Sequence, residues 1–438
     1  MLNEKMEPAQ DQKRPDQLKE RKDAYRVLLQ WQRDGAFIKE NGLSPFAMEL
    51  ALGVCRRYLY LLYVIKHLTK RMPSEEAGTI IAMGLVQMLY MNVPDYAAIA
   101  TSADLARAVG LGDGTASLVN GVLRGARRNG LPELPPQRVR KVSIENSVPE
   151  WLVRRWFDIY GGDRAEEIAR TTLTRPAEWL RVNLQKTNAP KLAQKLGFEN
   201  ASILYDRFVE VPENAKLKAV LESDAFAKGE FSLQNPSAYE VIKLLDLKPG
   251  LKVWDACAAP GGKSALMAEM DPSLDILASD VSENRMAKMQ DLAKRLGLTN
   301  IKTSCIDVLS LKNADATKNI GGSTRLAASY DRILLDVPCS NMGVLARRPE
   351  VVYRLSPESF KELAELQYDI LEAAATRLAA GGRLVYATCS PDPLETTQVV
   401  NRFIKSHPEF VKAGNPVFPA NKDSRFDGFF AQALIKNA

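Results

Sequence analysis

Two cysteines occupy positions from which a thiolate could react with a bound ligand. Cys339 lies in the motif Asp336-Val337-Pro338-Cys339-Ser340, and Cys389 lies in Ala387-Thr388-Cys389-Ser390. Each motif follows a short apolar run that is typical of a β-strand. A free cysteine is most often a small buried hydrophobic residue. Two of them at strand ends, where open α/β sheets bind their ligands, favour a chemical role instead.

A run of small residues could cradle that ligand. It reads Asp255-Ala256-Cys257-Ala258-Ala259-Pro260-Gly261-Gly262-Lys263-Ser264 and is expected between a strand and a helix. Small residues let a ligand approach the backbone, and a helix N-terminus offers free amides to a carboxylate or phosphate. A phosphate-binding P-loop requires glycine where Cys257 stands, and the pattern GxGxxG is absent. Nucleoside triphosphates and dinucleotides are therefore disfavoured.

Acidic residues are expected at three successive strand ends. Asp255 ends the first strand, Asp280 ends the second, and Asp307 suits the end of the third. A carboxylate in the position of Asp280 can accept hydrogen bonds from both ribose hydroxyls of a nucleoside cofactor, and Asp307 suits an adenine edge. One acid after a strand is more often a cap or turn residue. Three in succession favour a nucleoside site.

Methylation of cytosine at carbon 5 is a reaction that needs such a thiolate. Carbon 5 is a poor nucleophile until a thiolate adds at carbon 6 and makes the ring an electron-rich enamine. Carbon 5 can then attack a sulfonium methyl group, after which loss of its proton and elimination of the cysteine restore the enzyme. An acid at N3 assists the addition, and Asp336 is the candidate. The residues alone leave open which cysteine attacks.

The elements that must position these residues are strands alternating with helices. Strands are expected at residues 253–255, 276–278, 332–335 and 383–386. This pattern predicts an α/β fold with a doubly wound, largely parallel sheet, whose ligands bind beyond the carboxyl ends of the strands.

The chain divides into five expected parts. In the N-terminal region apolar residues recur every three to four positions, which indicates helices. Breaks between these helices are expected at Pro94-Asp95 and at Gly112-Asp113-Gly114. The stretch from Arg124 to Lys141 holds six basic residues against one acid. It is expected to be either a solvated linker or an RNA contact. The parts are a mobile lead-in (1–22), an all-helical domain (23–130), a basic linker (131–148), a small α/β accessory domain (149–233) and the α/β domain with the reactive motifs (234–438).

The composition is that of a folded protein of modest positive charge. Of the 438 residues, 46% are hydrophobic and 26% charged, and the net charge of +6 favours polyanionic partners. Five cysteines without a CxxC pair, and only two histidines, argue against a disulfide framework or a zinc site. No apolar run approaches the roughly 20 residues that span a bilayer. We therefore expect a cytoplasmic protein that binds neither metal nor membrane. The sequence does not give the oligomeric state, and we take the protein as a monomer.

The reactive motifs together resemble the Sun (Fmu) branch of the RNA cytosine-C5 methyltransferase family. The similarity extends to Arg181-Val182-Asn183, to Asp427-Gly428-Phe429-Phe430, and to an N-terminal region similar to the NusB-type RNA-binding domain. The resemblance implies a Rossmann-like class I methyltransferase sheet, S-adenosylmethionine as cofactor and a hairpin loop of small-subunit (16S) ribosomal RNA as substrate. A loop cytosine can leave its stack more cheaply than a paired one.

The resemblance also assigns roles to individual residues. Cys389 is implied as the nucleophile and Cys339 as the residue that helps release product, whereas DNA cytosine methyltransferases attack with their Pro-Cys cysteine. Lys263 is implied to orient Asp336. The implied cofactor contacts are Cys257, Ala258, Ala259, Pro260, Gly261, Gly262, Lys263, Asp280, Asp307 and Asp336.

The sequence departs from the family pattern at three places. These are Val337, where alanine is common; Asn341-Met342-Gly343, where Gly-Thr-Gly is common; and residues 391–396, which replace a segment that usually ends Glu-Asn. Both cysteines and the acids remain, so the departures bear on substrate fit more than on chemistry. Arg347 and Arg348 either hold the flanking RNA backbone or form a solvated pair. The rival functions are a non-catalytic ribosome-assembly factor and the same chemistry on transfer RNA.

Overall fold

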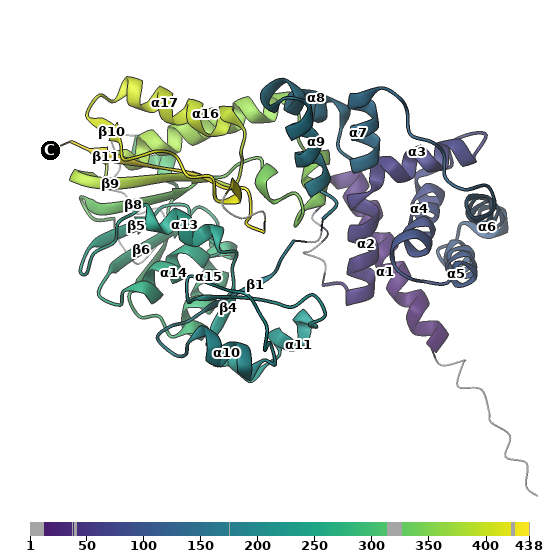
Figure 1. The fold of residues 1–438 in the computed structure, drawn as a ribbon, viewed down its shortest axis with the longest axis horizontal. Coiled ribbons are helices and arrows are strands. Elements are labelled where there is room, and N and C mark those ends of the chain that lie inside the picture. Colours follow the sequence, from purple (N-terminus) through teal and green to yellow (C-terminus); the bar gives the residue numbers. More distant parts are fainter. Residues whose placement is uncertain are drawn as a thin grey trace, which may run out of the picture. The chain divides into compact units, whose positions relative to one another are not determined.

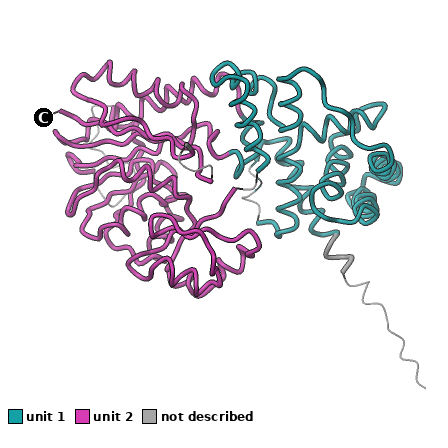
Figure 2. The backbone as a smooth tube through the Cα atoms, in the orientation of Figure 1, with its two compact units in different colours: residues 1–175, 345–354 teal, residues 176–344, 355–438 magenta. Residues whose placement is uncertain are grey.

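The computed structural model describes residues 13–36, 38, 42–174, 176–312, 326–421 and 425–437. The chain forms two compact units, which Figure 2 shows in different colours. Unit 1 consists of Met1–Arg175 and Leu345–Arg354, and unit 2 consists of Pro176–Val344 and Leu355–Ala438. A short segment from the C-terminal half of the sequence thus belongs to the N-terminal unit.

Unit 1 is built from helices (Figure 1), and the apolar faces of the first six of them meet in one core. Leu28, Ile81 and Leu123 are fully buried there. Two helices begin at the expected breaks, after Pro94 and at Gly112, and the predicted helical N-terminal region is confirmed. The helices are α1 (Lys13–Asp34), α2 (Pro45–Arg56), α3 (Tyr58–Leu68), α4 (Glu75–Tyr90), α5 (Asp95–Ala108), α6 (Gly112–Asn129), α7 (Arg138–Asn146), α8 (Glu150–Tyr160) and α9 (Gly162–Thr171).

Part of the expected mobile lead-in is helical. Residues 1–12 lie outside the described residues, but α1 begins at Lys13. Leu18 packs against the helical core, and the buried Arg21 donates a hydrogen bond to Gln87 Oε1 at 2.8 Å. The prediction of a mobile segment is therefore wrong for residues 18–22, because tertiary contacts hold this polar sequence in a helix.

The segment Leu345–Arg354 packs within unit 1 through its 3-10 helix η4 (Pro349–Tyr353). The Tyr353 ring meets the rings of Trp31 and Tyr58 edge-on at 5.4 and 5.7 Å, and its hydroxyl donates to Ser147 O at 2.7 Å. Arg347 and Arg348 lie in this segment and so belong to unit 1.

Unit 2 begins with a small antiparallel sheet of order β2-β3-β1-β4. Arg181, from the Arg-Val-Asn motif, is fully buried; it pairs with Glu269 at 2.8 Å and donates to Gly262 O at 2.7 Å. Both partners lie in α14, so this arginine fixes the small sheet to that helix. The elements are β1 (Trp179–Val182), α10 (Ala189–Lys195), β2 (Ile203–Leu204), β3 (Phe208–Glu210), α11 (Leu217–Leu221), α12 (Asp224–Ala227) and β4 (Phe231–Leu233).

The expected accessory domain, residues 149–233, is divided between the two units. Its first two helices, α8 and α9, belong to unit 1, whereas the four-stranded sheet belongs to unit 2.

A seven-stranded sheet of order β10-β11-β9-β8-β5-β6-β7 forms the rest of unit 2. The pairs from β7 to β9 are parallel, and β11 and β10 add antiparallel pairs at one edge. The predicted doubly wound α/β fold is confirmed. The elements are α13 (Ser237–Lys243), β5 (Lys252–Asp255), α14 (Gly262–Met270), β6 (Asp275–Asp280), α15 (Glu283–Leu296), β7 (Ile301–Cys305), η2 (Val308–Lys312), β8 (Tyr330–Asp336), η3 (Met342–Val344), α16 (Pro357–Ala375), β9 (Leu378–Thr388), η5 (Pro393–Glu395), α17 (Thr397–Ser406), β10 (Phe410–Lys412), η6 (Pro419–Asn421) and β11 (Phe430–Lys436).

Helices cover both faces of this sheet, with α13 and α14 on one face and α16 and α17 on the other (Figure 1). The strand register then sets which side chains meet at the carboxyl edge. Asp280 is opposite Cys305, and Asp336 is opposite Ala387, two residues before Cys389. The order reverses between β5 and β8, where such sheets bind ligands.

Candidate active site

The structure brings the two predicted cysteines together. Cys339 lies in the loop after β8, and Cys389 directly follows β9, the parallel neighbour of β8. Their sulfur atoms are 2.6 Å apart, and Cys389 Sγ donates to Asn341 Oδ1 at 3.1 Å. Cys339 is 9% exposed. Either thiol could reach the same atom of a bound base.

Asp336 and Lys263 form an ion pair beside these thiols. Lys263 Nζ lies 2.5 Å from Asp336 Oδ2, and it also sits over the Phe429 ring, 4.5 Å from the ring centre. Lys263 is near the N-terminus of α14, and Phe429 belongs to the Asp-Gly-Phe-Phe motif. The predicted partnership of Lys263 and Asp336 is thus present in the geometry.

The electrostatics keep Cys389 protonated and Lys263 charged. The hydrogen bond with Cys339 raises the pKa of the Cys389 thiol well above its ordinary value, and burial and the Asp336 carboxylate add to this. Lys263 acts in the opposite direction on that pKa. For Lys263 itself, burial lowers the pKa, but the Asp336 carboxylate outweighs burial and raises it. Ionisation of Cys389 is therefore opposed mainly by its hydrogen bond with Cys339 and by burial, and Lys263 is the group that favours it.

The small-residue loop lies between β5 and α14, as expected. Gly261 has a φ of +99°, and a Cβ there would lie 2.5 Å from Met289 Cγ, so only glycine fits. The fully buried Asp255 accepts a hydrogen bond from Ser264 Oγ at 2.5 Å. Its other oxygen has no partner among the described residues. Burial, the largest cause, raises the pKa of Asp255 to about 7, and burial likewise raises the pKa of the Cys257 thiol.

Asp280 ends β6 and is 3% exposed. Arg285 Nη2 lies 2.6 and 2.8 Å from its two oxygens, while the backbone amides of Ser282 and Ala259 donate to the same oxygens at 3.0 and 3.3 Å. A carboxylate offers about four lone-pair sites, and these four bonds use them. Ribose hydroxyls could therefore bind Asp280 only by displacing Arg285.

Asp307 lies two residues beyond the end of β7. Its Oδ1 accepts a hydrogen bond from Leu309 N at 3.0 Å and thereby caps the 3-10 helix η2. This is the ordinary role of an acid after a strand. Its contact with an adenine edge stays a prediction.

Comparison with known proteins places this geometry in a family. A protein from Bacillus subtilis (strain 168) named probable ribosomal RNA small subunit methyltransferase B is 35% identical over 425 residues, which cover 91% of this chain and 93% of the relative. The chain belongs to the RsmB/F family of 16S rRNA methyltransferases. Ribosomal RNA small subunit methyltransferase B of Salmonella arizonae is 32% identical, over 89% of both chains. The resemblance to the Sun (Fmu) branch is confirmed.

Three family models match successive parts of this RsmB/F chain. They are the NusB family at residues 14–128, the RsmF/B-like ferredoxin-like domain at 148–211, and the 16S rRNA methyltransferase RsmB/F family at 242–429. Two solved structures share the fold. The crystal structure of PH0851 has a TM-score of 0.75 and 23% identity over 96% of this chain and 98% of that one. A methyltransferase homologue from Pyrococcus horikoshii has a TM-score of 0.55 and 24% identity over 69% of this chain and all of that one.

Sequence reasoning missed three partners of the RsmB/F site. Asn341 accepts a hydrogen bond from Cys389, Arg285 engages Asp280, and Phe429 packs against the Lys263 ammonium. Asn341 and Phe429 stood in motifs compared with the family, but only the packing of distant segments shows what they contact. Arg285 had a local signal, since it follows Asp280 by five residues and reaches back from the first turn of α15.

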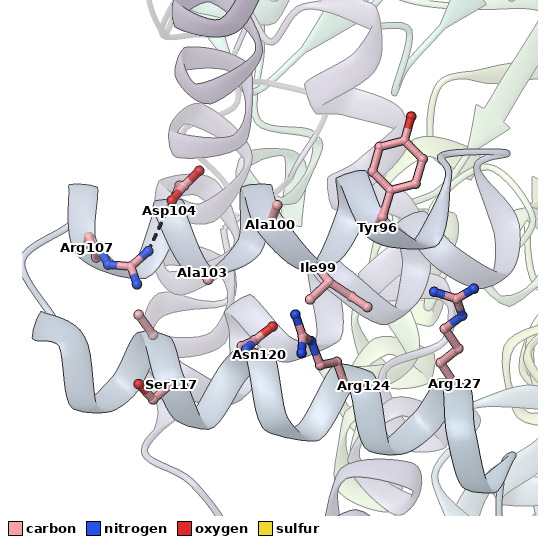
Figure 3. A pocket seen from close by; sticks show the side chains of 11 residues that line it. Tyr96, Ile99, Ala100, Ala103, Asp104, Arg107, Ser117, Asn120, Arg124 and Arg127 are labelled. Carbon is pink, nitrogen blue, oxygen red and sulfur yellow. Dashed lines mark hydrogen bonds and ion pairs between the residues drawn. The ribbon is translucent and has the colours of Figure 1, made fainter.

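A second concave site lies in unit 1, between α5 and α6 (Figure 3), with a volume of about 570 Å³. Tyr96 stands at one end and is 74% exposed. Arg107 pairs with two aspartates, and Arg127 lies 3.3 Å from Asp95. Arg124, within the described ranges, makes no ion pair, and it points into the groove.

No group of three or more His, Cys, Asp or Glu side chains that could hold a metal ion occurs in the described ranges. No described helix is long and apolar enough to cross a membrane.

Proposed function

We propose that this protein transfers a methyl group from S-adenosylmethionine to carbon 5 of a cytosine in 16S ribosomal RNA. The observation that carries the proposal is the adjacency of the Cys339 and Cys389 sulfurs beside the Asp336–Lys263 pair. Two thiols serve a reaction that forms a sulfur–carbon bond and must later break it. The names of the family and of the relatives supply the class of RNA.

In the first step Cys389 adds to carbon 6 of the cytosine. A sulfur–carbon bond forms, the proton of the thiol passes to Asp336, and Asp336 gives a proton to N3, so that no net charge builds up on the ring. Lys263 favours the thiolate by opposing the charge of Asp336. Carbon 5 becomes nucleophilic as a result.

In the second step carbon 5 gains the methyl group and then passes its proton to Cys339, which gives its own proton to the departing Cys389 sulfur. The electrons of the broken C–H bond form the double bond between carbons 5 and 6 as the bond from carbon 6 to Cys389 breaks, and the N3 proton returns to Asp336. S-adenosylmethionine, when bound, supplies an electrophilic methyl group. We assign Cys339 to the release step because it lies 2.6 Å from the sulfur that must leave. Once the bond breaks, Cys389 returns to the thiol or thiolate form and can act again.

The carboxyl edge of the sheet fits the cofactor. Gly261 keeps the loop free of side-chain bulk, and carboxylates at the ends of successive strands suit hydroxyl, amine and sulfonium groups. We propose that residues 257–263, Asp280, Asp307 and Asp336 hold it. Asp280 would exchange the guanidinium of Arg285 for the ribose hydroxyls.

We further propose that unit 1 binds RNA, with the α5–α6 groove as one contact. The groove combines an exposed aromatic ring, Tyr96, on which a base can stack, with the guanidinium of Arg124, which forms no ion pair with any described residue and can bind a phosphate. Its other arginines are offset by aspartates, so the contact is local and not a broad basic surface.

The test is tritium transfer from labelled S-adenosylmethionine to unmodified small-subunit ribosomal RNA, followed by bisulfite sequencing. We expect one protected cytosine in a loop, no transfer with Cys389→Ala, and an RNA adduct that survives denaturing electrophoresis with Cys339→Ala. Labelling of transfer RNA alone would move the substrate to that class. Binding without labelling of any RNA would favour the non-catalytic assembly factor.

A further inference from the structure

A buried carboxylate that the steps above do not use lies beside the two cysteine loops. Glu395, in the turn after Cys389, is fully buried. Its Oε1 accepts hydrogen bonds from Ser340 N at 2.8 Å and Gln367 Nε2 at 3.0 Å. Its Oε2 accepts from Ser340 Oγ and Ser390 Oγ, each at 2.5 Å. Four donors thus satisfy this one carboxylate, which offsets the cost of burying it.

The donors connect this carboxylate to both reactive loops. Ser340 directly follows Cys339, and Ser390 directly follows Cys389. Gln367, from α16, also donates to Pro338 O at 2.9 Å, on the other side of Cys339. Glu395 therefore holds the residue after each cysteine, and Gln367, which is bonded to Glu395, holds the residue before Cys339.

The main chain of Glu395 is fixed as well. The fully buried Tyr386, three residues before Cys389, donates its hydroxyl hydrogen to Glu395 O at 2.6 Å, and the same hydroxyl lies 3.0 Å from Gln367 Oε1. The side chain and the main chain of Glu395 are thus bonded to α16, which supports the Cys339 loop, and to β9, which leads to Cys389.

We infer that Glu395 is a positioning residue that keeps the two thiols in register while the methylated base is released. The inference rests on the proposed function, because it needs Cys389 to bond the base and Cys339 to assist its release. Hydrogen bonds to an ionised acceptor are about twice as strong as neutral ones. A glutamine of the same shape has one acceptor oxygen, so it cannot accept from all four donors.

The experiment compares Glu395→Gln with wild type on two RNAs, one ordinary and one carrying 5-fluorocytosine at the target. With S-adenosylmethionine present, carbon 5 takes the methyl group and keeps its fluorine, which cannot leave as a proton does, so the second RNA counts cysteine attack and methyl transfer without release. We expect Glu395→Gln to attack 5-fluorocytosine RNA at the wild-type rate. On ordinary RNA its kcat should fall about tenfold to a hundredfold, as for a lost hydrogen bond to a charged group, and adduct should accumulate in denaturing gels.

The matched control is Glu365→Gln on the same helix as Gln367, which removes an exposed carboxylate paired with Arg402 and should behave as wild type. If Glu395→Gln folds poorly, Ser390→Ala replaces it, because this variant removes only one of the four donors to Glu395. It should accumulate adduct to a lesser extent than Glu395→Gln.

Three results would overturn the inference. Unchanged turnover and no adduct with either variant would remove Glu395 from the release step. Attack on 5-fluorocytosine RNA reduced as much as kcat would show a general structural role. If wild type itself forms no adduct with 5-fluorocytosine RNA, the proposed function fails and the inference fails with it, a result distinct from the other two.

Discussion

Asp255 should make unit 2 less stable as the pH rises from acid to neutral. Its carboxyl is fully buried, and burial raises its pKa to about 7. In the unfolded chain the pKa is about 3.9, so between these pH values the native state binds more protons than the unfolded state. The free energy of unfolding therefore falls as the pH rises through this window. The contribution of Asp255 to the free energy of unfolding is fully present below pH 4 and is lost by about pH 7, and it amounts to about 4 kcal/mol.

The perturbation is Asp255→Asn, which keeps the shape and can still accept the hydrogen bond of Ser264. Its amide nitrogen would replace an oxygen that has no partner in the described part of the chain. The buried amide would lower the free energy of unfolding by the same amount at every pH. The slope with pH, and not the absolute stability, is thus the informative quantity. Urea unfolding from pH 4 to pH 8 should show a decline in wild type that the variant lacks. The control is Asp275→Asn, at the half-exposed start of β6. Equal slopes in wild type and Asp255→Asn would show that the Asp255 carboxyl does not cause the decline.

Three further predictions concern the site and the groove. Asp280→Ala should raise the dissociation constant of S-adenosylmethionine about tenfold to a hundredfold in calorimetry, because ribose hydrogen bonds are lost. Arg285→Ala should not raise it. An unchanged affinity in Asp280→Ala would remove this residue from the site. Lys263→Met should shift the pH profile of kcat to higher pH, because this lysine lowers the pKa of the thiol; a lower kcat with the same profile would assign it another role. Arg124→Ala should raise the KM for RNA and reduce the slope of log affinity against log salt by about one, with cofactor binding unchanged. The control is Arg154→Ala, which changes another exposed arginine of unit 1. An unchanged salt slope would show that the groove does not contact RNA.

The sequence predicted the reactive edge of the sheet well because strand periodicity determines it. Once β8 and β9 are recognised as parallel neighbours, Asp336, Cys339 and Cys389 must come to the same edge. The assignment of attack to one of the two thiols came from family resemblance and not from the residues. The geometry does not distinguish them either, since each sulfur is within 2.6 Å of the other.

What the sequence could not predict depends on contacts between distant segments. Glu395 is an acid in a segment that departs from the family pattern, and nothing local shows that four donors converge on it. The apolar residues of Leu345–Arg354 indicate burial, but not that they pack within unit 1. The helix at residues 18–22 was missed for the same reason, since Leu18 and Arg21 are held by the core and by Gln87.

The measurement that tests the central claim most directly is the identification of the cysteine that bonds the base. Wild-type protein is allowed to react with S-adenosylmethionine and 5-fluorocytosine RNA, the adduct is digested, and the modified peptide is sequenced by mass spectrometry. We expect the nucleotide to be attached to Cys389. Attachment to Cys339 would contradict it and would reverse the roles assigned to the two thiols.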